Sequence, residues 1–156
     1  AMKISGIYRL HSRMSQSARQ RTSQSFRSAE RQSVLVTTDV SSRGVDYPDV
    51  SLVVQYGSPD NDDTYIHRLG RTGRAGKQGK GLQVLLPFEQ GVISKLKSRG
   101  IEKATLESTI DTKRLEKAFR TVRSGDAVLT PAIQGAYRSF LACYTERAAE
   151  LGVTAG

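Results

Sequence analysis

The stretch that decides the predicted fold is Ser33-Val34-Leu35-Val36-Thr37-Thr38-Asp39-Val40-Ser41-Ser42-Arg43-Gly44-Val45-Asp46. Its unbroken apolar run, Val34 to Val36, is typical of a strand buried on both faces, as in a parallel sheet. Small polar residues follow where this strand would end, and in open α/β sheets ligands bind at that end of the strands. The stretch therefore predicts an α/β domain with a ligand site just after this strand.

Residues within and after this stretch support the same interpretation. Two more apolar runs, residues 52–56 and residues 81–86, predict further strands of a mainly parallel sheet. Gly44 would let the backbone approach a phosphate closely, and Asp46 is an acceptor suited to a ribose hydroxyl. The pattern is therefore compatible with a nucleotide ligand.

A dense group of cations lies downstream, in Thr64-Tyr65-Ile66-His67-Arg68-Leu69-Gly70-Arg71-Thr72-Gly73-Arg74. On a helical period, its apolar residues fall on one stripe and cations fall on another face. The apolar residues are Tyr65, Ile66 and Leu69, and the other face carries His67 and Arg71. Gly73 suits the left-handed residue that ends a helix, so Arg74 would point separately. Two arginines placed in this way could clamp one polyanion, although a solvated basic helix face explains the same pattern.

Together these stretches resemble the second RecA-like domain of a DEAD-box RNA helicase. Residues 38–46 are similar to that family's motif V, which usually has two alanines in place of Ser41 and Ser42. Residues 65–74 resemble its motif VI almost letter for letter, and residues 10–19 resemble its motif IVa. The resemblance covers roughly residues 4–100, and it implies a RecA-like sheet flanked by helices.

The resemblance implies a role for each matching residue. Arg71 and Arg74 would be arginine fingers that stabilise the γ-phosphate of ATP during its transfer, which is the catalytic role of such residues. His67 would communicate with the carboxylate-bearing motif of the partner domain. Asp46 would hold the ATP ribose, and Gly44 would lie beside the nucleotide. The residues that match contacts to the RNA backbone are Gln16, Arg19, Thr38, Arg43 and Gly44.

The sequence has no Gly-x-x-x-x-Gly-Lys-Ser/Thr loop and no Asp-Glu-Ala-Asp segment. An arginine finger acts only beside a site that holds ATP and Mg²⁺. We therefore expect ATP and Mg²⁺ to be held mainly by an N-terminal RecA-like domain that lies outside this chain and acts as its partner in cis. The isolated chain is expected to bind RNA weakly and to have no measurable ATPase activity.

Composition excludes several classes of protein. No run approaches the ~20 apolar residues that span a bilayer, so we expect no membrane association. The lone Cys143 cannot form an internal disulfide and is expected to be a small buried residue. The two histidines lack partners at the spacing of a metal site, so no zinc site is predicted. A monomer is expected.

The positive charge is unevenly distributed. Residues 1–100 contain 16 Lys and Arg against 8 Asp and Glu, a net charge of +8, whereas residues 101–156 contain 8 against 7, a net charge of +1. A basic surface of this kind suits a polyphosphate and predicts salt-sensitive binding. For any single arginine, a solvated face remains the alternative.

Two amphipathic helices are predicted after Gly100. The first covers residues 111–124, and the second follows Thr130-Pro131 and would end at Gly152. The apolar residues of the second are Ile133, Ala136, Tyr137, Phe140, Leu141 and Tyr144. The predicted domains are therefore a helicase C-terminal domain, residues 1–104, and a helical C-terminal extension, residues 105–156.

Part of the second predicted helix carries a further resemblance. Residues 136–144 resemble the extension of mitochondrial DEAD-box RNA chaperones. A similar pattern follows the core of some nucleolar ribosome-assembly helicases, so both compartments stay open. Packing of an amphipathic helix explains the same residues without a dedicated binding site.

Three functions are compatible with these features. The first is half of an ATP-dependent RNA helicase that binds single-stranded RNA through its backbone and locally unwinds duplexes. The second is the corresponding domain of a DNA-directed superfamily 2 helicase, whose fold and arginine motif are related. The third is a non-catalytic RNA-binding module. The motif VI and motif IVa residues favour RNA, and the pair of arginines at finger positions favours catalysis.

Overall fold

The computed structural model describes residues 4–42, 46–47, 50–93, 97–98, 100–104 and 112–151. The chain divides into two compact units, unit 1 (Ala1–Leu86) and unit 2 (Pro87–Gly156). This division precedes the boundary at residue 104 that the sequence suggested, and it assigns the segment after Leu86 to the helical unit.

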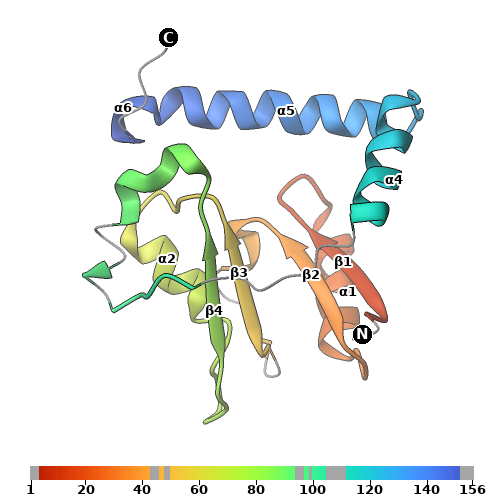
Figure 1. Ribbon diagram of the computed structural model, residues 1–156. Coiled ribbons are helices and arrows are strands. Elements are labelled where there is room, and N and C mark those ends of the chain that lie inside the picture. Colours follow the sequence, from red (N-terminus) through yellow and green to blue (C-terminus); the bar gives the residue numbers. More distant parts are fainter. Residues whose placement is uncertain are drawn as a thin grey trace. The chain divides into compact units, whose positions relative to one another are not determined.

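Unit 1 alternates strands and helices along the chain (Figure 1). Its elements are β1 (Gly6–Leu10), α1 (Gln16–Arg27), β2 (Ser33–Thr37), the 3-10 helix η1 (Asp39–Ser41), β3 (Leu52–Tyr56), α2 (Asp62–Leu69) and β4 (Lys80–Val84). β1 pairs with β2 and β3 pairs with β4, both in parallel, and the two pairs form separate sheets. The α/β class and the parallel strands are therefore confirmed, while the sheet is divided into two ribbons.

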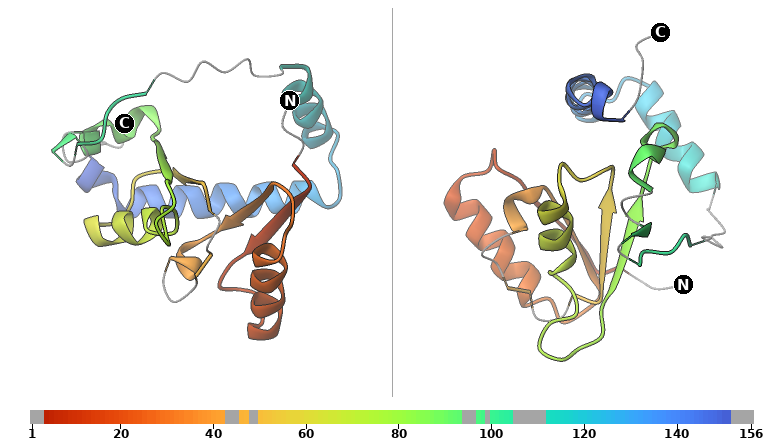
Figure 2. Two further views of the ribbon diagram at one scale, coloured as in Figure 1. Left: turned by 90° about the horizontal axis from the view of Figure 1, so that it is seen from below. Right: turned by 90° about the vertical axis from the view of Figure 1, so that its left-hand side faces the viewer.

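The helices of unit 1 lie on the same side of the strands (Figure 2). α1 begins after Ser15, whose side chain accepts a hydrogen bond from the N–H of Ala18 at 3.3 Å, as an N-cap residue does. The opposite face of β2 is exposed, because Val34 is 39% and Val36 is 60% solvent-accessible. The prediction that this strand is buried on both faces is therefore wrong for the observed unit, since its helices cover a single face.

α2 ends earlier than its periodicity suggested. Asn61 caps its start by accepting from the N–H of Thr64 at 2.8 Å, and Tyr65 packs into the interior with 7% exposure. The helix ends at Leu69, and Gly70 occupies the C-cap position. Gly73 has the expected left-handed conformation, with φ of +67°, but it lies in the loop beyond the helix. Arg71 is therefore a loop residue rather than a helical one.

β3 has the predicted bounds, and β4 starts one residue earlier and ends two residues earlier than the run 81–86. Gly81 packs closely on α2, because a Cβ there would collide with Cδ1 of Leu69 and force that side chain to move. Close packing of the α2 end against β4 therefore fixes where the following loop begins.

Unit 2 consists of helices. They are η2 (Pro87–Val92), α4 (Thr112–Arg123), α5 (Leu129–Glu146) and α6 (Ala148–Leu151). Both predicted amphipathic helices are present, although the second ends at Glu146 rather than at residue 152, which lies outside the described residues. Within the described part of the chain, no helix is long and apolar enough to span a membrane.

An aromatic cluster holds η2 against α5. The ring of Phe88 lies edge-on to those of Phe140 and Tyr144, with centroids 6.4 and 4.9 Å apart. The Tyr144 hydroxyl donates to Oε1 of Glu89 at 2.9 Å, and Glu89 is fully buried. Burial and the carboxylate of Glu89 raise the pKa of Tyr144 well above its usual range, so this phenol remains a donor. Cys143 is exposed, so the expectation that it is buried is wrong.

Candidate functional site

Three of the residues predicted to contact RNA lie just after the C-terminal ends of β1 and β2. Parallel strands end at the same edge, and the N–H of Thr38 donates to the carbonyl of Leu10 at 3.3 Å across those ends. The hydroxyl of Thr38 does not cap η1. Gln16 and Arg19 lie in the first turn of α1, which follows β1, and they line an open groove with Leu10 and Val40. The structure therefore brings Gln16, Arg19 and Thr38 to one end of the strands.

One polar atom in this groove lacks a partner inside the protein. Nε of Arg19 is buried and makes no hydrogen bond. A buried guanidinium donor without an acceptor is costly, because its interactions with water are lost. An external acceptor, such as a phosphate oxygen, would satisfy it. Arg43 and Gly44, which were also predicted to bind RNA, lie outside the described residues.

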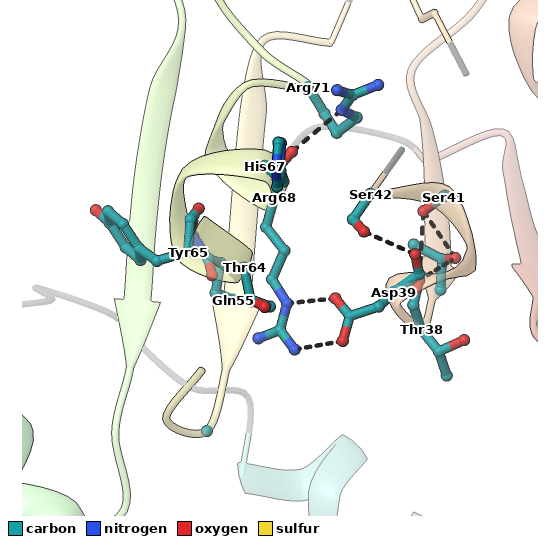
Figure 3. A network of polar contacts seen from close by, with 12 residues as sticks. Thr38, Asp39, Ser41, Ser42, Gln55, Thr64, Tyr65, His67, Arg68 and Arg71 are labelled. Atoms are coloured by element: carbon teal, nitrogen blue, oxygen red, sulfur yellow. Dashed lines mark hydrogen bonds and ion pairs between the residues drawn. The ribbon is translucent and has the colours of Figure 1, made fainter. Parts of the chain in front are cut away.

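A bidentate ion pair joins motif V to motif VI (Figure 3). Nε of Arg68 donates to Oδ1 of Asp39 at 2.6 Å, and Nη2 of Arg68 donates to Oδ2 of Asp39 at 2.8 Å. The guanidinium and carboxylate planes are matched by two parallel bonds, which fix orientation as well as distance. α2 is therefore tied to η1 through one side chain from each.

The two serines of motif V are compatible with burial. Ser41 and Ser42 are 4% and 7% exposed, where the family usually has alanine. The hydroxyl of Ser41 donates to Oγ1 of Thr37 at 2.9 Å, and that of Ser42 donates to the carbonyl of Asp39 at 2.7 Å. Because both hydroxyls are satisfied within the motif, the departure from alanine leaves no buried polar group unpaired.

The second part of the site contains both predicted arginine fingers and the predicted ribose-binding residue. Nη1 of Arg74 donates to Oδ1 of Asp46 at 2.7 Å, and Nε of Arg74 donates to the carbonyl of Gly70 at 2.7 Å. Nε of Arg71 donates to the carbonyl of His67 at 3.2 Å. Residues 28 positions apart in the sequence therefore meet, as the assignment of one nucleotide site to them requires.

Arg71 and Arg74 form a pair of cations in this part of the site, and Asp46 lies beside them as a counter-ion. Burial lowers the pKa of Arg71, the charge of Arg74 lowers it further, and Asp46 opposes both effects. Arginine remains protonated at any physiological pH. Each guanidinium therefore retains its positive charge, and an added polyanion would relieve the repulsion between the two cations.

The loop between α2 and β4 is held in place at both ends. The hydroxyl of Thr72 donates to the carbonyl of Val50, just before β3. Gly79 is packed so closely that a Cβ there would collide with the backbone nitrogen of Gly73. Thr72 and Gly73 lie between Arg71 and Arg74, so their contacts hold the backbone that carries both arginines.

The side chain of His67 is exposed, and its backbone carbonyl is the acceptor for Arg71. Its predicted communication with a partner domain stays a prediction. No group of three or more metal-ligating side chains occurs within the described ranges. The guanidinium groups of Arg71 and Arg74 are donors suited to phosphate oxygens, and the carboxylate of Asp46 is an acceptor suited to a hydroxyl.

Sequence reasoning missed the partner of Arg68 and the residues that anchor Asp46. Asp39 and Arg68 are 29 residues apart, and no spacing rule connects them. Tyr47, which follows Asp46, is 4% exposed, and its hydroxyl is hydrogen-bonded to that of Ser23 on α1. An aromatic residue directly after an acidic site residue was the available signal for this anchor.

Comparison with known proteins agrees with these motifs. Residues 3–76 match the family described as helicase conserved C-terminal domain. DEAD-box ATP-dependent RNA helicase 31 of Arabidopsis thaliana is 44% identical over 144 residues, which cover 90% of this chain and 19% of that protein. This chain spans 17% and 19% of the length of two curated relatives that it matches.

Two solved structures extend the comparison. Domain 2 of the DEAD-box helicase Mss116p bound to an RNA duplex matches with a TM-score of 0.69 and 28% identity, over 96% of this chain and 57% of that one. The C-terminal domain of the DEAD-box protein Dbp5 matches with a TM-score of 0.52 and 35% identity, over 74% of this chain and 68% of that one. The RecA-like fold is thereby confirmed. The chain belongs to the DEAD-box RNA helicase family and represents its C-terminal helicase domain.

Proposed function

We propose that this chain supplies one half of the ATP site and part of the RNA-binding surface of an ATP-dependent RNA helicase. The observation that carries the proposal is the meeting of Asp46 and Arg74 at 2.7 Å, with Arg71 close enough to share their electrostatics. An acceptor for a ribose and two cations for phosphate are the groups that this half of the site must provide.

In the proposed reaction, the γ-phosphoryl group passes through a transition state in which negative charge is spread over its oxygens. Arg71 and Arg74 stabilise that charge, and a finger of this kind is worth about 10³ to 10⁵ in rate. Asp46 accepts a hydrogen bond from the ribose, through its exposed carboxylate. ATP and Mg²⁺ are held mainly by the N-terminal RecA-like domain, which supplies the phosphate loop and the metal ligands.

RNA binding is proposed at the edge formed by Gln16, Arg19 and Thr38, together with Arg43 and Gly44. Solved relatives carry single-stranded or duplex RNA, which supports this assignment. Amide, hydroxyl and guanidinium groups bind phosphate and sugar oxygens without reading bases. Binding is therefore expected to be largely independent of sequence, and ATP-driven closure of the two domains would locally destabilise a duplex.

The test is RNA-stimulated ATP hydrolysis by the full-length protein, with Arg71→Ala and Arg74→Ala variants. Arg21→Ala is the matched control, because Arg21 is an exposed arginine on α1 that does not line the groove. We expect turnover to collapse in both finger variants while ATP binding is largely retained. Unchanged turnover in both, with folding intact, would remove the finger assignment and leave a role in packing or RNA binding.

A second measurement tests ATP hydrolysis and RNA binding by the isolated chain, for comparison with the full-length protein. We expect the isolated chain to be a monomer that binds RNA weakly and hydrolyses no ATP. Hydrolysis that disappears when Arg71 or Arg74 is replaced would show that the phosphate-binding half is not needed, which contradicts the proposed division of the site.

A further inference from the structure

Asp46 and its neighbour Tyr47 lie in opposite environments. The side chain of Asp46 is 68% exposed, whereas Tyr47 is 4% exposed. An exposed carboxylate makes few packing contacts of its own, so its position depends on how firmly its backbone is held. The buried ring of Tyr47 therefore anchors the backbone next to Asp46.

Tyr47 is anchored to α1 by two kinds of contact. Its hydroxyl and that of Ser23 are 3.1 Å apart, and the hydrogen bond is partly buried. Its ring meets the ring of Phe26 edge-on, with centroids 5.3 Å apart and planes at 77°. Phe26 in turn meets Tyr8 of β1 at 5.7 Å. The anchor is therefore continuous from β1 through α1 to the residue after Asp46.

The same helix carries the residues proposed to bind RNA. On α1, steps of three, four and three residues separate Gln16, Arg19, Ser23 and Phe26. Residues at this spacing lie along one stripe of a helix. A helix of this length moves as a rigid body, so a displacement at its first turn is carried to Ser23 and Phe26.

Asp46 itself contacts the loop after α2, because its Oδ1 accepts a hydrogen bond from Nη1 of Arg74 at 2.7 Å. The contacts therefore run from Gln16 and Arg19, through α1, to Tyr47, Asp46 and Arg74. Each link is a hydrogen bond, a ring contact, a peptide bond or an ion pair.

We propose that Tyr47 is a positioning residue that couples the RNA-binding edge on α1 to Asp46 and Arg74. This inference rests on the proposed function of those residues. Tyr47 itself touches neither RNA nor nucleotide. It fixes the distance between α1 and Asp46, so that placement of α1 by RNA favours the arrangement of Asp46 and Arg74 that binds ATP. By linkage, ATP must then favour RNA binding by the same factor.

The experiment uses the full-length protein and a thermodynamic cycle. The Kd for a single-stranded RNA is measured with and without a non-hydrolysable ATP analogue, and their ratio is the coupling factor. Tyr47→Phe removes only the hydroxyl, and Ser23→Ala removes its partner. Tyr56→Phe is the matched control, because Tyr56 is 68% exposed and the same atom is removed there.

We expect Tyr47→Phe and Ser23→Ala each to lower the coupling factor about two- to tenfold, the range of one hydrogen bond. In Tyr47→Phe the Kd for RNA alone and the Tm should change little, since the ring contacts remain. Ser23 lines the groove with Gln16 and Arg19, so Ser23→Ala is judged by the coupling factor alone. The double variant should be no worse than either single one, because both remove the same bond. Tyr56→Phe should leave the coupling factor unchanged.

Different failures have different meanings. If the wild-type protein shows no coupling between RNA and nucleotide, the proposed function is wrong. If it shows coupling that neither Tyr47→Phe nor Ser23→Ala reduces, the positioning role is wrong and the proposed function stands. Equal loss in Tyr56→Phe would also overturn the inference, because the effect would not be specific to the anchor. Should Tyr47→Phe fold poorly, Ser23→Ala tests the same bond from α1.

Discussion

The cationic residues of motif VI have different environments although they lie within a few residues of one another. Arg68 is engaged by Asp39 through two hydrogen bonds and ties α2 to η1. Arg71 and Arg74 are each held by a backbone carbonyl, and both arginines interact electrostatically with Asp46. The first arginine therefore joins two elements of unit 1, and the other two lie beside Asp46.

The contribution of the Asp39–Arg68 pair to stability can be measured with a double-mutant cycle. Asp39 is 46% and Arg68 is 24% exposed at the side chain, so solvent screens the pair and we expect a coupling energy of about 0.5–1 kcal/mol. The measurement is denaturant unfolding of Asp39→Ala, Arg68→Ala and the double variant. Simple additivity of the two single changes would show that the bidentate geometry contributes nothing to folding.

Replacing Gly79 with alanine is expected to lower ATP turnover although no charged group is removed. A Cβ at this position would collide with Gly73, so Gly79→Ala must displace the loop that carries Arg71 and Arg74. Because a misplacement of about 1 Å can cost 10²-fold in rate, we expect ATP turnover of the full-length protein to fall at least tenfold. RNA binding by the nucleotide-free protein should be retained.

Gly135→Ala is the control for this prediction. Gly135 lies in α5, where no atom would meet an added Cβ, and alanine is favoured over glycine within a helix. Turnover should be unchanged in this variant. Full activity of Gly79→Ala would mean that the loop accommodates the extra atom and that its close packing does not position the arginines.

At the residue scale, the sequence predicted which residues belong to the candidate site better than it predicted which residues they pair with. The resemblance to motif V and motif VI gave Asp46, Arg71 and Arg74 as one site, and they lie together. It gave no partner for Arg68, because ion pairs across 29 residues follow from the tertiary fold alone. Tyr47 was overlooked for the same reason: its burial depends on α1, which lies far earlier in the chain.

At the scale of elements, apolar periodicity located β2 and β3 well and misplaced the end of α2. Hydrophobic spacing reports which face of a segment packs, but the end of a helix depends on capping and tertiary bonds. Here Gly70 takes the C-cap position, and Thr72 bonds to Val50 instead of continuing the helix. The same dependence on tertiary contacts explains why burial of β2 on both faces could not be predicted from its apolar run.

The start of α5 gives a pH-dependent prediction. The N–H groups of Leu129 and Val128 donate to the carboxylate of Asp126, and these bonds lower its pKa below the usual 3.8. Since the folded-state pKa is depressed, the stabilisation is present above pH 3.8 and is lost as pH falls through the folded-state pKa. We expect helix content, followed by circular dichroism, to decrease in that range.

Asp126→Asn provides the comparison. Asparagine can still accept from the same N–H groups but does not titrate, so its helix content should depend less on pH in that range. An identical pH profile for both proteins would show that other carboxylates control the acid response of α5.

For the whole molecule, the net charge of +9 resides almost entirely in residues 1–100. A surface of that charge attracts nucleic acid irrespective of base sequence, and its contribution is screened by salt. The charge difference between residues 1–100 and residues 101–156 predicts that RNA binding is concentrated in the first range.

Salt dependence identifies which arginines face phosphates. Replacing a residue that contacts a phosphate of single-stranded RNA lowers the slope of log Kd against log salt by about 0.7. We expect this change for Arg19→Gln in the full-length protein. Arg21→Gln, on the same helix but outside the groove, should leave the slope unchanged. Equal slopes in the two variants would contradict placement of RNA along that groove.

The division into units could be predicted only approximately. Sequence composition changes after residue 100, which placed the expected boundary at 104, whereas the compact units divide at Leu86. The cause lies in contacts that no local pattern reveals: Phe88 and Glu89 precede the compositional change but pack with Phe140 and Tyr144 of α5.

The division of the strands into two pairs has a practical consequence (Figure 1). Among the described elements, each strand is hydrogen-bonded to one neighbour, so each offers a second edge of backbone donors and acceptors. Such edges are templates for an incoming extended segment, including one from another copy of the chain. The monomer expected of the isolated domain is therefore a property of dilute solution. Concentrating the domain during purification is expected to drive it towards oligomers and precipitate, and short peptides with high strand propensity should compete with that association.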